Sequence, residues 1–317
     1  MERFIIGRIL SSLVVLLIVS IVVFAALQAA PGDPAALMLG PQAAEPEMQP
    51  ALEALRVEMG LDQPVYVQYT LWLGNLLRGD FGNSIRNNLP VLPLILGRIP
   101  ATVELLIVGL IIGVVLAFPG GILSAVKRGT WIDHFISLFA ASGIAIPSFW
   151  FGLLLILIFS VNMKWLPASG YVSILEDPIG NLQRVILPGL TLGLYLAAYI
   201  TRFLRADLLE VLNADYIRTA RAKGLTEGRV IFVHALKNSL ISVLTILGIL
   251  IGSLLGGVVI IEQVFGWSGV GWLSIQAIAV RDYPMVQGVV LFAAASFILA
   301  NLAVDLLYGF VDPRVRD

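Results

Sequence analysis

Residues 214–241 read ADYIRTARAKGLTEGRVIFVHALKNSLI and hold the densest positive charge of a very apolar chain. The stretch contains five Lys and Arg residues and two acids: Arg218, Arg221, Lys223, Arg229 and Lys237, with Asp215 and Glu227. It lies between two long uncharged runs, 185–201 and 238–261. A charged helical insert between two such runs indicates a segment that leaves a membrane and returns to it.

The composition of the whole chain supports that interpretation. Of its 317 residues, 58% are hydrophobic and 13% are charged, and the mean hydropathy is +0.93. Soluble domains carry about 25% charged residues. The net charge of −1 argues against nucleic-acid binding, which needs a basic face that neutralises many phosphates. With no cysteine and two histidines, we expect no disulfide and no metal site.

Long uncharged runs define the expected spans, because about 20 apolar residues in a helix cross the hydrocarbon core. We expect an all-α integral membrane protein with six transmembrane helices, at about 9–30, 105–126, 135–163, 185–204, 238–261 and 283–304. The first run exceeds the apolar core of about 7–15 residues found in signal peptides, so we expect it to be retained. Pro147 and Pro188 lie inside spans, where neighbouring helices can take up the freed carbonyls.

A seventh uncharged run, 263–280, is interrupted by glycines and contains Trp267 and Trp272. We expect it to be a short interfacial or re-entrant piece with the tryptophans at headgroup depth. The segment 31–104 contains two stretches with helical spacing, 51–59 and 66–77, and is expected to be ordered.

The positive-inside rule predicts the orientation. With both termini in the cytoplasm, most Lys and Arg residues fall on the inner side, whereas a seven-span arrangement would move Arg314 and Arg316 outside. The predicted inner cations are Arg3, Arg8, Lys127, Arg128, Arg202, Arg205, Arg218, Arg221, Lys223, Arg229, Lys237, Arg314 and Arg316. The chain is therefore expected to be a single transmembrane domain, 1–317, with an outer loop at 31–104 and a cytoplasmic loop at 205–237.

The motifs of two kinds of hydrolytic enzyme are absent. The chain contains neither the phosphate-binding pattern GxxxxGK[ST] nor HExxH. GWSG at 266–269 resembles the Gly-x-Ser-Gly of intramembrane serine proteases, but that serine needs a base within hydrogen-bond reach. His134 and His234 fall on the predicted inner side and Ser268 on the outer side. We therefore expect no catalytic residue.

A secondary carrier is a second class to weigh, and it would need an ionisable group deep in the membrane. Glu104, Glu262 and Asp305 lie at span ends, where their side chains are expected to reach water. The fifth span also carries Gly248, Gly252 and Gly256 at four-residue spacing, which lines one helix face with backbone. Such a face favours close helix packing over substrate contact, and two subunits or two gating helices could meet there.

The basic insert itself is expected to form a helix, a sharp turn and a second helix. Residues 201–223 have helical spacing, Gly224 suits a helix C-terminus, and Thr226 can cap the next helix. The apolar and small residues of the first helix form a stripe edged by Arg218 and Arg221; its members are Tyr216, Ile217, Ala220 and Gly224. This pattern suits docking into a groove on another protein, although basic clusters also enforce topology or bind anionic lipid.

DYIRTARAKGL (215–225) followed by VHALKNSLI (233–241) closely resembles the cytoplasmic coupling loop of ABC importer permeases of the dipeptide, oligopeptide and nickel subfamily. Further motifs resemble the first permease subunit of that subfamily, in the same order. They are PGDP (31–34), GLDQPVYVQY (60–69), GDFGNS (79–84), ATVEL (101–105), AVKRG (125–129), EQVFGWSGVG (262–271), RDYPMVQG (281–288) and DLLYGFVDPRVR (305–316). Arg218 and Thr219 stand where the broad importer motif usually has Glu-Ala.

The resemblance implies an ABC type I importer permease fold in the cell membrane. It implies import of short peptides by alternating access, with a nickel or other metal chelate, or a glutathione-like compound, as the alternative cargo. The implied partners are a second homologous permease, two ATPase subunits that bind ATP and Mg, an extracytoplasmic solute-binding protein facing 31–104, and membrane lipid. The residues implied to contact an ATPase are Asp215, Tyr216, Arg218, Thr219, Ala220, Arg221, Lys223 and Gly224.

Overall fold

The structure is a computed structural model that describes residues 2–29, 32–58 and 60–311. Within these residues the chain is helical, and pairing of extended backbone is limited to an isolated bridge between Asn83 and Pro90. The chain divides into two compact units, a larger one built mainly from Ala101–Trp272 and a smaller one from Ile6–Pro100 and Leu273–Ile298. Each unit is described by itself below.

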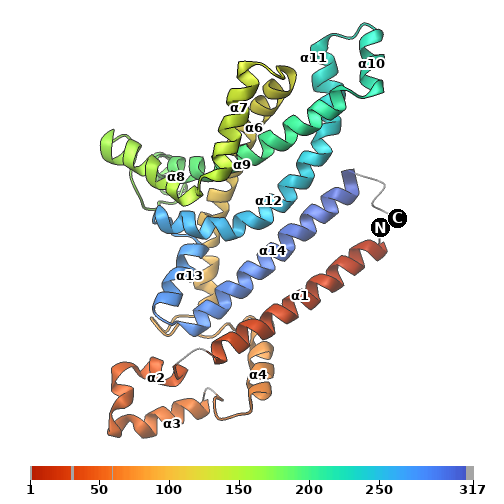
Figure 1. Ribbon diagram of the computed structural model, residues 1–317. Coiled ribbons are helices and arrows are strands. Elements are labelled where there is room, and N and C mark those ends of the chain that lie inside the picture. Colours follow the sequence, from red (N-terminus) through yellow and green to blue (C-terminus); the bar gives the residue numbers. More distant parts are fainter. Residues whose placement is uncertain (1, 30–31, 59, 312–317) are drawn as a thin grey trace. The chain divides into compact units, whose positions relative to one another are not determined.

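The larger unit is a helical assembly around one long central helix, α9 (Figure 1). In chain order its elements are α6 (Ile99–Val126), α7 (Trp131–Ala145), α8 (Ser148–Leu155), the π-helical turn η3 (Ile156–Asn162), α9 (Pro178–Leu212), α10 (Asp215–Ala222), α11 (Glu227–Arg229), the π-helical turn η4 (Val230–Ala235) and α12 (Leu236–Val264). Helices α7, α8 and α12 all pack on α9. Its apolar side chains therefore form the centre of the unit.

Close packing of α6 on α9 depends on a face of small residues on α6. Cβ atoms built at Gly109 and Gly113 would lie 2.7 Å from side-chain atoms of Leu192 and Leu196, respectively. Gly121 meets Leu204 in the same way. These glycines recur at multiples of four residues, so they let the two backbones approach along a single face.

The smaller unit contains most of α1 (Glu2–Gln28) and the helices that follow it. These are α2 (Pro34–Leu39), the short 3-10 helices η1 (Gly40–Ala44) and η2 (Pro46–Met48), α3 (Gln49–Glu58), α4 (Val65–Leu77) and α5 (Val91–Leu96), with parts of α13 (Val270–Ala279) and α14 (Tyr283–Val311). Helices α3 and α4 confirm the two helical stretches expected in the outer loop. Asp33 caps α2 by accepting a hydrogen bond from Ala35 N at 3.0 Å.

Four helical segments of the described residues are long and apolar enough to cross a membrane: Ile6–Gln28, Val91–Val126, Pro178–Leu212 and Tyr283–Ala303. They overlap the first, second, fourth and sixth expected spans and extend beyond four of the eight expected limits, both of them at the fourth span. The fifth expected span lies within α12, a helix of 29 residues, but many of its side chains are outside those that the structure describes. The count of six spans and the orientation of the termini stay predictions.

The third expected run is not one straight helix. Helix α7 and the segment Ser148–Asn162 meet at an angle of 105°. Ile146, the residue before Pro147, is extended (φ −83°, ψ 127°), because the proline ring disfavours a helical conformation there. Pro119 and Pro188, by contrast, remain inside α6 and α9.

Most of the seventh run forms the short helix α13, its interfacial or re-entrant character stays a prediction, and Trp267 before it is buried. Its side chain is fully buried, and its indole Nε1 donates to the carbonyl oxygen of Ala101 at 2.8 Å. Tyr171 packs edge-on against it, with ring centroids 4.8 Å apart. The Trp267 side chain therefore faces the chain itself and not lipid, since its polar group is satisfied inside the chain, and its depth in the membrane stays a prediction.

Candidate functional site

The basic insert forms a helical hairpin at one end of the larger unit, made of α10 and α11 (Figure 1). We expected a continuous helix over 201–223, and that is wrong: α9 ends at Leu212 and α10 begins at Asp215. Between them, the Asn213 side chain donates to Leu209 O at 2.7 Å, and Ala214 adopts an extended conformation. A separate helix of eight residues therefore leaves the end of α9 at a turn.

Gly224 ends α10, as predicted. Its φ is +79°, its N–H donates to Arg221 O at 2.9 Å, and Leu225 N–H donates to Ala220 O at 3.4 Å. These two bonds are the Schellman arrangement, which needs a left-handed residue at this position. Thr226 stands at the N-cap position of α11, but its side chain makes no capping hydrogen bond within the described chain.

Arg221 closes the hairpin from inside. Its Nε lies 2.7 Å from Glu227 Oε1, and its Nη2 donates to Glu227 Oε2 at 3.3 Å. Its Nη1 donates to Leu212 O at 3.4 Å, so one side chain joins the ends of three helices. The hydrogen bond from Arg221 holds the pKa of Glu227 below its ordinary value. The Arg221–Glu227 pair is called the hairpin clamp below.

The apolar stripe that we expected to be available for docking is partly used by the chain itself. Ile217 is fully buried in the core of the larger unit, and Ala220 is only 8% exposed. Tyr216 is exposed, and its hydroxyl accepts a hydrogen bond from Asn238 of α12 at 2.6 Å. Ala220 therefore lies against the chain's own core, although the resemblance placed it at the contact with an ATPase.

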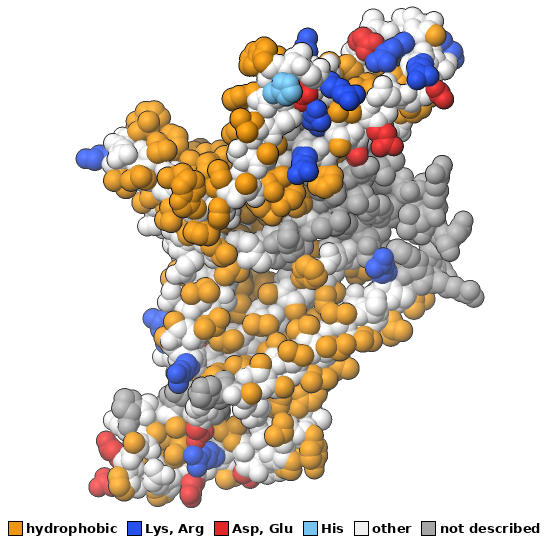
Figure 2. Space-filling model, viewed as in Figure 1, with side chains coloured by type: hydrophobic (Ala, Val, Ile, Leu, Met, Phe, Trp, Pro, Cys, Tyr) orange, Lys and Arg blue, Asp and Glu red, His pale blue; other side chains and the backbone are white. Residues whose placement is uncertain are grey.

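What α10 presents to solvent is mostly polar. Four exposed polar residues of α10 and its C-cap, called the α10 outer face below, are Asp215, Arg218, Thr219 and Lys223; Tyr216, Arg221 and Ala222 are exposed as well. Arg218 and Asp215 form an exposed pair at 3.2 Å, which contributes little to stability. Figure 2 shows Lys, Arg, Asp and Glu side chains gathered over this hairpin, whereas hydrophobic side chains dominate around α7 and α8. The outer face is therefore suited to binding a polar partner.

A buried carboxylate that the sequence pattern did not single out lies at the base of the same end of the unit. Asp133 of α7 accepts two hydrogen bonds from Arg205 of α9, at 2.7 and 2.9 Å, and one from Gly129 N at 2.9 Å. Ser124 Oγ donates to it as well. These bonds join the motif AVKRG to α7 and α9. The ion pair of Asp133 with Arg205 therefore holds α7 to α9 next to the hairpin.

A second buried carboxylate joins two more motifs. Glu262 is fully buried, and it accepts hydrogen bonds from Thr102 Oγ1 at 2.6 Å and from Trp272 N at 2.8 Å. Thr102 Oγ1 in turn accepts one from Val270 N at 2.9 Å. We expected Glu262 to reach water, and that is wrong: the chain folds back on it so closely that a side chain at Gly269 would collide with it.

A third buried carboxylate, Asp282, joins two sequence motifs of the smaller unit. It is almost fully buried, and it accepts hydrogen bonds from Ser84 Oγ and from Ile85 N, the latter at 3.0 Å. GDFGNS and RDYPMVQG, far apart in the sequence, therefore meet at one carboxyl group. A buried acid beside a hydroxyl residue and glycines is the common feature of these three junctions, but the sequence does not show which motif pairs with which.

The glycine face of α12 has different surroundings at the two of its positions that the structure describes. Gly248 is buried, whereas Gly256 is exposed and has no described atom within 4 Å of a Cβ built on it. The surroundings of Gly252 lie outside the described residues. The role of this face as a packing or gating surface stays a prediction. Among the residues searched, no group of three His, Cys, Asp or Glu side chains could hold a metal ion.

The fold defines the class of protein. Two structures of the methionine ABC transporter MetNI in inward-facing conformations, a native and a selenomethionine-soaked crystal form, match 69% of this chain and 96% of theirs. Their TM-scores are 0.55 and 0.57, at 21% and 19% sequence identity. The chain thus has the ABC type I importer permease fold, as predicted.

The sequence comparisons define the family. Residues 109–317 match the family described as binding-protein-dependent transport system inner membrane component, and residues 1–106 match the N-terminal membrane component of such systems. The chain belongs to this family. It is an ABC importer permease of the cell membrane, which confirms the class, transport function and localisation that we predicted.

Three relatives align over the full length of this chain. The oligopeptide transport system permease protein AppB of Bacillus subtilis (strain 168) is 43% identical over 320 residues, and all of it is covered. A putative peptide transport system permease protein of Brucella abortus (strain 2308) is 42% identical over 316 residues, with 99% of it covered. The glutathione transport system permease protein GsiC of Escherichia coli (strain K12) is 41% identical over 316 residues, with the same coverage.

Proposed function

We propose that this permease imports short peptides as the transmembrane subunit of an ATP-driven transporter. The observation that carries the proposal is the full-length identity of 42–43% to permeases named for peptide and oligopeptide transport. Short peptides are zwitterions that cannot cross the hydrocarbon core unaided, since burying unpaired charges there is costly. The chain would therefore supply the path, and alternating access would expose it to each side in turn.

We propose further that the α10 outer face docks on a separate ATPase subunit, which binds ATP and Mg. The support is mechanical. Ile217 anchors α10 in the core around α9, and the hydrogen bond between Tyr216 and Asn238 ties it to α12. A force applied to the outer face would therefore pass into two long helices rather than be lost in a flexible loop.

The assembly we propose contains a second homologous permease, two ATPase subunits and an extracytoplasmic solute-binding protein. The family description, which names dependence on a binding protein, supports the last of these. Residues 31–104 offer a surface for it, since the described part of this segment contains helices α2 to α5 rather than a simple linker.

Glutathione is the second candidate cargo. GsiC of E. coli is 41% identical to this chain, and AppB is 43% identical to it. Identity to this chain therefore hardly distinguishes the glutathione permease from the oligopeptide permease. Glutathione is itself a small peptide-like molecule, and one path could accept both.

Deletion of the gene, followed by uptake measurements in intact cells, tests the cargo. Radiolabelled dialanine and radiolabelled glutathione are supplied separately, and the wild-type gene is returned on a plasmid as the control. We expect dialanine uptake to fall on deletion and to recover with the plasmid. Loss of glutathione uptake alone would transfer the assignment to glutathione, and unchanged uptake of both would exclude both cargoes.

A further inference from the structure

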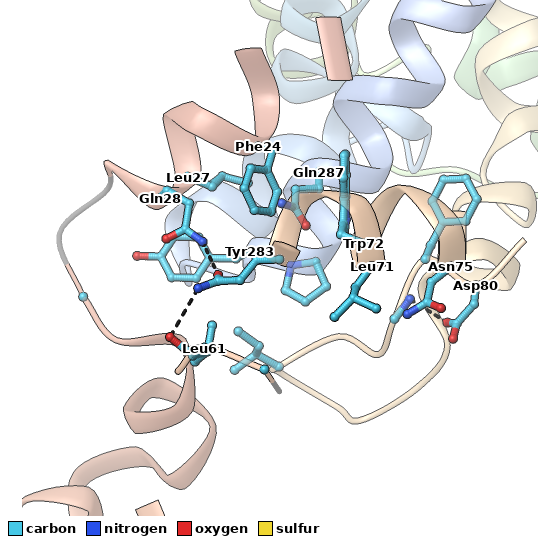
Figure 3. A pocket seen from close by; sticks show the side chains of 17 residues that line it. Phe24, Leu27, Gln28, Leu61, Leu71, Trp72, Asn75, Asp80, Tyr283 and Gln287 are labelled. Atoms are coloured by element: carbon cyan, nitrogen blue, oxygen red, sulfur yellow. Dashed lines mark hydrogen bonds between the residues drawn. The ribbon is translucent and has the colours of Figure 1, made fainter. Parts of the chain in front are cut away.

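The smaller unit contains a pocket of about 350 Å³ that no motif predicted (Figure 3). Its walls come from the C-terminal end of α1, from α4, from the loop at 80–85 and from the first turns of α14. This volume lies in the range of about 300–1,000 Å³ that is typical of small-molecule sites. On the predicted topology the pocket lies on the outer side of the membrane.

One wall of the pocket is apolar and aromatic. The rings of Phe24 and Trp72 lie with centroids 5.5 Å apart, and Leu27 and Leu71 extend this surface. Such a wall gains free energy by covering an apolar side chain of a ligand.

The lining also carries amides and one acid. Asn75 and Gln287 line the pocket, and within the described part of the chain their side chains make no hydrogen bond. A carboxamide both donates and accepts, so it matches the N–H and C=O groups of a peptide bond. Asp80 accepts a hydrogen bond from Gly82 N at 2.9 Å through one oxygen and adds a negative charge at the edge. No Lys or Arg is among the described residues that line the pocket.

The walls are fixed before any ligand arrives. Ser20 and Tyr69 share a hydrogen bond of 2.9 Å that holds α1 to α4. Gln28 Nε2 donates to Gln68 Oε1 at 2.6 Å, which closes one end of the pocket. Asp282, through Ser84 and Ile85, fixes the loop at 80–85 to the start of α14. A preformed site loses less entropy when it binds.

From this lining we infer that the pocket binds a short peptide that has a free amino terminus and an apolar side chain. The amides would pair with its backbone, Asp80 would attract its ammonium group, and the wall of Phe24 and Trp72 would cover its side chain. The absence of cations from the described lining disfavours phosphates and anionic headgroups. The inference rests on the proposed function, since it identifies a receiving site for the same class of cargo.

Binding of leucyl-leucine to the purified transporter complex without nucleotide or binding protein, measured by calorimetry, tests this site. Leu71→Trp fills the pocket from a half-exposed position, and Leu77→Trp places the same side chain at an exposed position of α4 that does not line it. We expect the first variant to weaken binding roughly tenfold or more and the second to leave it unchanged. Equal binding by both variants would overturn the inference.

Asp80→Asn gives a second, independent readout because it changes charge and not size. We expect it to weaken leucyl-leucine binding roughly tenfold but to leave N-acetyl-leucyl-leucine unaffected. Asp62→Asn, an exposed position outside the pocket, is the matched control. An equal effect on both peptides, or none on either, would overturn the role of Asp80.

Uptake of the same dipeptide in cells separates this inference from the proposed function. If the cells import the dipeptide but the complex does not bind it measurably, or if Leu71→Trp leaves binding unchanged, the pocket is not the binding site. The proposed import function would still stand. A transporter that imports no peptide at all removes the function. Displacement of leucyl-leucine by detergent alkyl chains but not by other dipeptides would identify the pocket as a lipid site and overturn the inference.

Discussion

Glu262 and Glu227 are two carboxylates of the larger unit that each stabilise a turn, one as a buried acceptor and the other in an exposed ion pair. Glu262 is fully buried and accepts from a hydroxyl and a backbone N–H, whereas Glu227 is exposed and pairs with Arg221. The first fixes helix packing, because it joins Thr102 of α6 to Trp272 of α13 at the end of α12. The second only shapes the hairpin and leaves the α10 outer face to solvent. The difference indicates that one end of the unit is built for rigidity and the other for contact with a partner.

The largest effect is expected from Glu262→Ala. It leaves the Thr102 hydroxyl and the Trp272 N–H without their acceptor, and each such loss costs about 1–3 kcal/mol. We expect a clear fall in the thermal unfolding temperature of the purified chain and in its yield from membranes. Glu262→Gln keeps the shape and one acceptor oxygen and is expected to be milder. Equal stability of wild type and Glu262→Ala would contradict the structural role.

Gly224→Pro is expected to be next in effect, and it acts on function rather than on insertion. Proline cannot adopt the φ of +79° and removes the N–H that bonds to Arg221 O. Substrate-stimulated ATPase activity of the reconstituted complex should be lost while the spans stay inserted. Gly224→Ala, which costs about 1–2 kcal/mol for the left-handed conformation, should lower it partly. Gly228→Ala, at an exposed position without positive φ, is the control.

Exchanging the two charges of the hairpin clamp tests whether Arg221 acts by pairing with Glu227 or by contacting the ATPase subunit. Arg221→Glu alone should reduce stimulated ATPase activity roughly tenfold, because it opposes two like charges across the turn. Adding Glu227→Arg recreates an opposite pair and should restore most of the activity. Persistent loss in the double variant would show that Arg221 contacts the ATPase directly, against our interpretation of the clamp.

The smallest effect is expected from lowering the pH, which protonates Glu227 of the hairpin clamp. Arg221 holds the pKa of Glu227 below its ordinary value of 4.5, so the clamp stabilises the hairpin at all pH values above that value. Its contribution declines as the pH falls below 4.5 and is lost once Glu227 is protonated. The protection of the α10 amides against hydrogen exchange, taken relative to the intrinsic exchange rate at each pH, should therefore fall below pH 4.5 in the wild type. In Glu227→Gln this protection should already be low at neutral pH, with no further step in this range.

Local features of this chain were predictable, and long-range partners were not. The end of α10 at Gly224 and the helices α3 and α4 follow from neighbouring residues, which the sequence displays directly. The burial of Glu262 depends on Thr102, far away in the chain, and nothing local distinguishes it from an acid at a wet helix end.

Prolines and glycines illustrate the same limit. Pro147 breaks its run and Pro188 does not, because the outcome depends on whether the surrounding helices favour an extended residue before the ring. Four-residue glycine spacing occurs on both α6 and α12, yet in the described chain it meets leucines of α9 at Gly109 and open space at Gly256. Spacing indicates a face that can pack, and only the fold supplies what packs on it.

The Schellman turn at Gly224, which fixes the end of α10, has a consequence for how transporters diversify. Main-chain bonds and the hairpin clamp hold α10 in place, so Asp215, Arg218 and Lys223 contribute little to the folding of their own chain. On the docking that we propose, substitutions there would change which ATPase subunit is recognised without a loss of stability. A cell with several paralogous uptake systems could thereby keep each set of parts from cross-assembling, by altering a few exposed charges.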